Sequence, residues 1–105
     1  MQAAIYGLAG PDLTADEAAF FRDARPAGYI LFRRNCETRD QMRRLTDALR
    51  ELEGDDNVAI LIDQEGGRVA RMRPPEWLAF PSGEAFDRLY QIAPSSAIEA
   101  ARVNA

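Results

Sequence analysis

The chain has 105 residues, which allow one small domain with its own core. The composition, 47% hydrophobic and 29% charged, is that of a globular protein, and no apolar run approaches the roughly 20 residues that span a bilayer. A net charge of -4 argues against a nucleic-acid-binding surface, which is usually basic. We therefore expect no nucleic-acid or membrane partner and, because the start does not resemble a signal peptide, a cytoplasmic location.

Two residue types that often carry enzyme chemistry are scarce. The chain has no histidine, which removes the commonest general acid or base. Cys36 is the only cysteine, so an internal disulfide and a cysteine-rich zinc site are excluded, and a lone thiol is more often inert than catalytic. We predict no metal ligands and no cofactor for this chain.

The sequence begins with alternating strand and helix signals. Residues 3–8 are mostly apolar and predict a strand. The capping-box pattern over residues 14–17 predicts a helix through about Ala24, which Pro26 stops. Residues 28–32 are apolar without alternation, which suits a strand that is buried on both faces.

The same order then repeats. A second capping-box pattern over residues 38–41 predicts another helix, which Gly54 ends. Apolar residues recur along this helix at helical spacing and form one core-facing stripe: Met42, Leu45, Leu49 and Leu52. Residues 58–62 are again apolar throughout and predict a third strand, with Asp63 at its carboxyl end.

Successive strands are about 25 to 30 residues apart, the length of a βα unit with a crossover helix, so the fold class is α/β with parallel strands. Two more helices are expected, one over residues 84–90 and one beginning at Pro94. The last helix has no stop signal, and a parallel barrel needs eight βα units. We expect about the first three units of a TIM-like barrel; a complete small three-layer α/β domain is the alternative.

The segment from Ile60 to Val69 is the best candidate for a site. In α/β proteins ligands bind at the carboxyl ends of parallel strands, where Asp63 is expected. Gly66 and Gly67 predict a turn with positive φ and a close approach of the backbone, and we expect Arg68 to pair with a carboxylate. An alternative is that the glycines form only a tight turn and that Asp63 caps a helix.

A resemblance to a known family rests on this segment and on a second one. Residues 30–35, Ile-Leu-Phe-Arg-Arg-Asn, and residues 63–71, Asp-Gln-Glu-Gly-Gly-Arg-Val-Ala-Arg, resemble the amino-terminal part of the glycoside hydrolase family 3 β-N-acetylhexosaminidases. The resemblance runs from about Tyr6 to the end. It implies that residues 1–105 are the amino-terminal part of a single barrel domain. That domain would hydrolyse terminal β-linked N-acetylglucosamine from muropeptides in cytoplasmic peptidoglycan recycling.

The resemblance also implies roles for single residues. Asp63 matches the aspartate that binds hydroxyls of the non-reducing sugar, and Arg71 matches an arginine that also binds substrate. A carboxylate can accept bonds from neighbouring hydroxyls, and such charge-assisted bonds are roughly twice as strong as neutral ones. Arg34 and Asn35 are expected to order loops at the mouth of the site. The aspartate nucleophile and the histidine acid/base of the family belong to later barrel loops, so this chain would carry no catalytic residue.

Several alternatives stay open. Asp63 and Glu65 form a catalytic pair if they share a strand face, since retaining glycosidases hold two carboxylates about 5 Å apart. Trp77 is either a platform for a sugar ring or a loop anchor. The chain itself is then either part of this enzyme, a non-catalytic fragment or interaction module, or part of a β-glucosidase-type member of the same family. The sequence does not determine the leaving group or the oligomeric state.

Overall fold

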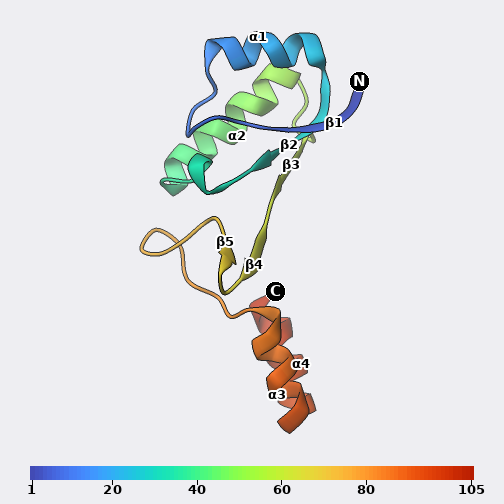
Figure 1. Ribbon diagram of the computed structural model, residues 1–105, viewed down its shortest axis with the longest axis vertical. Coiled ribbons are helices and arrows are strands. Elements are labelled where there is room, and N and C mark those ends of the chain that lie inside the picture. The colour runs from blue at the N-terminus through green and yellow to red at the C-terminus, as the bar shows by residue number, and fades with distance from the viewer. The chain divides into compact units, whose positions relative to one another are not determined.

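The computed structural model describes all 105 residues. They form two compact units, residues 1–63 and residues 64–105 (Figure 1). The first unit contains a parallel sheet and two α-helices, and the second contains a small hairpin followed by two helices. None of the helices is both long enough and apolar enough to cross a bilayer.

The first unit is built on a three-stranded parallel sheet. Its strands β1 (Gln2–Gly7), β2 (Pro26–Leu31) and β3 (Ala59–Ile62) lie side by side in chain order. Helix α1 (Ala15–Ala24) connects the first two strands and helix α2 (Arg39–Glu53) connects the next two, because parallel neighbours need a crossover. The predicted α/β class with parallel strands is confirmed for this unit.

Capping boxes fix the starts of both helices as the sequence predicts. At α1, Thr14 Oγ1 accepts a hydrogen bond from Glu17 N at 3.2 Å, and Glu17 Oε2 accepts one from Thr14 N at 3.0 Å. Thr38 and Gln41 form the equivalent pair at α2. Helix α2 ends at Gly54, whose φ of 64° is the left-handed conformation that glycine adopts without strain.

The second strand begins earlier than predicted. Arg25 adopts a left-handed conformation, with φ at 49°, and this residue ends α1. The chain continues directly into β2 at Pro26, two residues before the predicted start. Proline is tolerated at the first residue of a strand, where its missing N–H costs no ladder bond.

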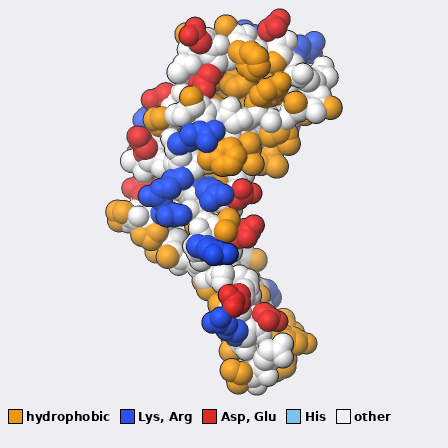
Figure 2. Space-filling model, in the orientation of Figure 1, with side chains coloured by type: hydrophobic (Ala, Val, Ile, Leu, Met, Phe, Trp, Pro, Cys, Tyr) orange, Lys and Arg blue, Asp and Glu red, His pale blue; other side chains and the backbone are white.

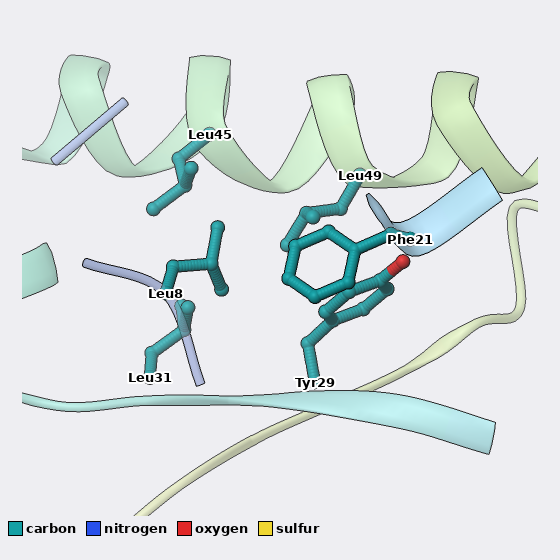
Figure 3. Close-up of a cluster of buried hydrophobic side chains, with 6 residues drawn as sticks. All are labelled: Leu8, Phe21, Tyr29, Leu31, Leu45 and Leu49. Atoms are coloured by element: carbon teal, nitrogen blue, oxygen red, sulfur yellow. The ribbon is translucent and has the colours of Figure 1, made fainter. Parts of the chain in front are cut away.

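The core of the first unit lies between the sheet and the two helices, which cover the same face (Figure 1). Figure 3 shows six buried side chains that meet there from both layers: Leu8, Phe21, Tyr29, Leu31, Leu45 and Leu49. Leu45 and Leu49 are at most 2% exposed, and Met42 and Leu52 pack beside them. The predicted core-facing stripe of α2 is therefore confirmed.

One buried polar group in this core has a partner. Tyr29 is fully buried, and its hydroxyl donates a hydrogen bond to the Glu53 carboxylate at the end of α2. Burial, followed by the adjacent carboxylate, raises the pKa of Tyr29. The tyrosine therefore stays neutral and anchors the end of α2 to the central strand.

The opposite face of the sheet is open in the first unit. Register places Ile5 beside Gly28 and Ala59, and Ile30 beside Leu61, on the side away from the helices. Ile5 is 50% exposed and Leu61 is 41% exposed, so apolar side chains reach the surface of this unit (Figure 2). The continuous apolarity of these strands predicts two buried faces, but in this structure only the helix-covered face has a core.

The second unit begins with a hairpin that the sequence predicts only as a turn. β4 (Gln64–Gly66) and β5 (Val69–Ala70) pair antiparallel around the tip residues 67–68. A segment without helix or strand leads to α3 (Gly83–Ile92), which packs against α4 (Pro94–Asn104). Both predicted helices are confirmed, with a proline in the first turn of α4.

Candidate functional site

The carboxyl ends of the three parallel strands define the candidate site in the first unit. Asp63 directly follows β3 and is exposed, as its predicted place at a strand end requires. Leu31 of β2 pairs with Ile62 of β3, so one further step of the register brings Phe32 opposite Asp63. The residues after β2 therefore share an edge with this carboxylate.

Arg34 is held in a fixed orientation at that edge, within the short 3-10 helix η1 (Arg33–Asn35). Its Nε donates to the Leu8 carbonyl at 2.7 Å, and its guanidinium carbon lies 4.7 Å from the centre of the Phe32 ring. A Cβ at Gly7 would lie 3.1 Å from Nη2, so the glycine leaves room for the guanidinium. Gly7 pairs with Ile30, which lies on the face away from the helices, so the Arg34 guanidinium lies on the open face of the sheet.

Asn35 connects the loop after β1 to the end of β2. The residue is fully buried, and its Nδ2 donates to the carbonyls of Leu8 at 3.2 Å and Gly10 at 2.7 Å. Its Oδ1 accepts from Phe32 N at 2.8 Å. The expectation that this asparagine orders loops is confirmed at the level of these contacts.

Gln41 has a second role that the sequence does not reveal. Besides completing the cap of α2, its Nε2 donates to the carbonyls of Pro11 at 2.6 Å and Asn35 at 2.9 Å. Its Oε1 accepts from Glu37 N at 2.9 Å, and the side chain is 4% exposed. A single buried amide thus joins the loop after β1, the turn after β2 and the start of α2.

The other side of the β1 loop is held by Glu17. Its Oε1 accepts a hydrogen bond from Ala9 N at 2.8 Å, while its Oε2 accepts the capping bond from Thr14 N. Burial raises the pKa of Glu17, but these backbone hydrogen bonds outweigh it and hold the pKa below its ordinary value. Glu17 therefore stays ionised and fixes the loop through charge-assisted bonds.

Cys36 is a structural residue here. Its thiol donates to the Phe32 carbonyl at 3.3 Å and is partly buried. Burial raises its pKa, and nearby Arg33 offsets this only in part. A raised pKa lowers the thiolate fraction, in line with the expectation of an inert thiol.

In the second unit, the backbone of Arg71 is positioned by Gln64. Gln64 Oε1 accepts from Arg71 N at 2.9 Å and Met72 N at 3.1 Å, and Nε2 donates to the Met72 carbonyl at 2.9 Å. Arg71 itself is partly buried. Gln64 is a functional candidate that sequence reasoning missed, although it lies inside the quoted motif.

The two glycines of the motif behave as predicted. Gly66 and Gly67 have φ values of 85° and 59°, and Gly67 N donates to the Phe80 carbonyl at 2.9 Å. A Cβ at Gly66 would lie 2.1 Å from the Pro81 carbonyl oxygen. Both the left-handed backbone and the close approach therefore require glycine, and the simpler assignment to a tight turn alone is insufficient.

The other candidate residues of the second unit, in the hairpin and in the segment after it, give mixed results. Arg68 forms no ion pair, so that prediction is wrong; its carbonyl instead accepts from Arg73 Nη2 at 3.4 Å. Glu65 is exposed at an irregularity of the β4–β5 pairing, which interrupts the two-residue alternation that a catalytic pair with Asp63 assumes. Trp77 is partly buried, and its backbone N donates to the Arg73 carbonyl at 3.1 Å.

Comparisons with known proteins agree with the motif. A β-hexosaminidase from Xanthomonas oryzae pv. oryzae is 38% identical over 101 residues, which cover 96% of this chain and 30% of that protein. NagZ from Neisseria gonorrhoeae, solved in complex with N-trifluoroacetyl-D-glucosamine, superposes with a TM-score of 0.81 and 30% identity over 92% of this chain and 28% of its own. The resemblance to β-hexosaminidases is thereby confirmed.

A more distant solved structure is also similar to the chain. A glycoside hydrolase family 3 β-N-acetylglucosaminidase from Paenibacillus sp. str. FPU-7 matches 78% of this chain and 16% of its own, with a TM-score of 0.70 and 27% identity. No protein-family model matches the chain. The chain spans about 30% of the length of the curated β-hexosaminidases that it matches.

Proposed function

We propose that the protein to which this chain belongs is a β-N-acetylhexosaminidase. It removes terminal β-linked N-acetylglucosamine from muropeptides in cytoplasmic peptidoglycan recycling. The observation that carries the proposal is the similarity to β-hexosaminidases over 96% of the chain. The exposed carboxylate of Asp63 at the end of a parallel strand supports it, because this is where α/β enzymes bind their ligands.

In this proposal residues 1–105 are the amino-terminal part of one TIM-like barrel domain. The parallel sheet supports a barrel, because its helices cover one face only and its open face carries Ile5, Ile30 and Leu61. Closing such a sheet into a barrel buries this face in the interior. The same closure brings the carboxyl ends of all strands around one site.

We assign substrate binding to Asp63 and Arg71, and no covalent step to this chain. The Asp63 carboxylate accepts hydrogen bonds from hydroxyls of the terminal sugar, and Arg71 is a further substrate-binding residue. The family that the chain resembles uses an aspartate nucleophile and a histidine acid/base, and this chain has no histidine. Both groups then belong to further barrel strands, and the carbohydrate is the only ligand that the proposal requires.

The test is hydrolysis by the product of the full reading frame that encodes this chain. We expect it to cleave a chromogenic β-N-acetylglucosaminide and an N-acetylglucosaminyl muropeptide, but to cleave the matching β-glucoside poorly. Equal or faster cleavage of the β-glucoside would favour a β-glucosidase-type member of the family. Hydrolysis by residues 1–105 alone would refute the assignment of the covalent chemistry to further strands.

A further inference from the structure

Arg34 has a feature that its loop-ordering role does not use. Its Nε is engaged with the Leu8 carbonyl, and its guanidinium face lies against the Phe32 ring. Neither Nη1 nor Nη2 has a hydrogen-bond or ion-pair partner in the structure, although the residue is exposed. The outer edge of the guanidinium, with its two parallel N–H groups, is therefore not engaged by a hydrogen-bond or ion-pair partner within residues 1–105.

The position of this edge is set by the sheet. Gly7 and Ile30 occupy one row on the open face, and the guanidinium lies over Gly7. Leu61 of β3 pairs with Ile30, and Asp63 comes two residues after Leu61, at the same carboxyl edge of the sheet. Arg34 is thus a second charged group of the first unit at the place where ligands bind in parallel α/β folds.

The orientation of Arg34 makes it a suitable ligand-binding group. Holding a long side chain usually costs side-chain entropy when a ligand arrives. Here the carbonyl of Leu8, the ring of Phe32 and the space at Gly7 already restrict the guanidinium. Two parallel N–H groups match the two oxygens of a carboxylate better than they match a single sugar hydroxyl.

We propose that the Nη edge of Arg34 binds a carboxylate of the substrate, outside the sugar that is removed. The proposal rests on the proposed function, because a muropeptide carries carboxylates on its peptide whereas the terminal N-acetylglucosamine is neutral. Asp63 then holds the sugar, while Arg34 selects for an anionic remainder. No proton or covalent bond changes hands at Arg34, so its contribution is to binding and specificity.

The experiment compares two substrates that differ only at their carboxyl groups: an N-acetylglucosaminyl muropeptide and the same compound with its carboxylates converted to amides. For the full-length protein we expect kcat/KM to be roughly ten- to hundredfold higher for the carboxylate form, the range of one hydrogen-bonded charged contact. Arg34→Gln should abolish this ratio while leaving cleavage of a neutral chromogenic β-N-acetylglucosaminide within about threefold, and Arg34→Lys should retain part of it.

Arg33→Gln is the matched control. Arg33 is the exposed neighbour in η1 and forms no side-chain hydrogen bond or ion pair, so this variant should keep the parent ratio. Loss of Arg34 should leave the loop intact, because the Leu8 carbonyl still accepts from Asn35 Nδ2.

Four outcomes would overturn the inference. The first is a parent enzyme that cleaves both muropeptide forms equally well. The second is an Arg34→Gln variant that loses activity equally on all substrates, which would indicate a structural role or a contact with the terminal sugar. If the parent cleaves the chromogenic substrate but the ratio is unchanged in Arg34→Gln, only this inference fails. If the parent enzyme cleaves neither the muropeptides nor the chromogenic substrate, both this inference and the proposed function fail.

Discussion

Replacing Asn35 with alanine tests whether buried side-chain amides hold the loop after β1. The substitution removes three hydrogen bonds: two that Nδ2 donates to Leu8 and Gly10 carbonyls, and one that Oδ1 accepts from Phe32 N. The Leu8 carbonyl keeps Arg34 Nε as a donor, so two backbone groups lose their partner. At about 1 to 3 kcal/mol for each backbone group left without a partner, we expect the free energy of unfolding to fall by about 2 to 6 kcal/mol.

The assay is urea unfolding of the full-length protein, followed by far-ultraviolet circular dichroism. Asn57→Ala is the matched control, because Asn57 is exposed and its side chain forms no hydrogen bond; we expect a change within about 0.5 kcal/mol. A loss below about 1 kcal/mol for Asn35→Ala, with an unchanged slope, would refute the reasoning. It would mean that water replaces the amide at both backbone groups.

Three further predictions follow from single residues. Asp63→Ala should lower kcat/KM on the chromogenic substrate while the covalent intermediate still forms; failure to trap it with a fluorinated sugar at saturation would contradict a binding role. Gly66→Ala should lower the melting temperature strongly, because φ is 85° and the new Cβ would lie 2.1 Å from the Pro81 carbonyl oxygen, whereas Gly10→Ala, with no atom within 4 Å, should change it little. The lowered pKa of Glu17 stabilises the fold above the ordinary glutamate value of 4.5, and this contribution is lost as pH falls through the folded-state pKa. Glu17→Gln should therefore reduce the slope of stability against pH below 4.5, and an unchanged slope would contradict the assignment.

Most of the fold could be predicted from signals between residues that are close in the sequence. Each predicted capping box is formed by residues three positions apart, so the sequence window contains the whole interaction. The same holds for the stripe of α2 and for the glycine turn, whose positive φ values follow from residue type. The hairpin strands were missed because β5 is only two residues long, too short for a recognisable alternation.

Contacts between loops were not predictable in the same way. Asn35 reaches Gly10 across 25 positions and Gln41 reaches Pro11 across 30, and both contacts depend on β1 and β2 lying side by side. Gln41 has a sufficient local explanation as a capping residue, which conceals its second role. The predicted ion pair of Arg68 failed for the opposite reason: an exposed arginine at a hairpin tip gains little from a surface pair, so charge alone does not fix its partner.

The position of the candidate site follows from how the loop carbonyls are satisfied. The loop after β1 offers the carbonyls of Leu8, Gly10 and Pro11, and each accepts a hydrogen bond from a side chain that follows β2. The end of β2 is therefore tied to the end of β1 by side chains, in addition to the ladder of the sheet. Asp63 follows β3, which pairs with β2 over four consecutive residues. Binding groups that extend from such rigid elements need little reordering when a ligand arrives, which is the condition for a precise site.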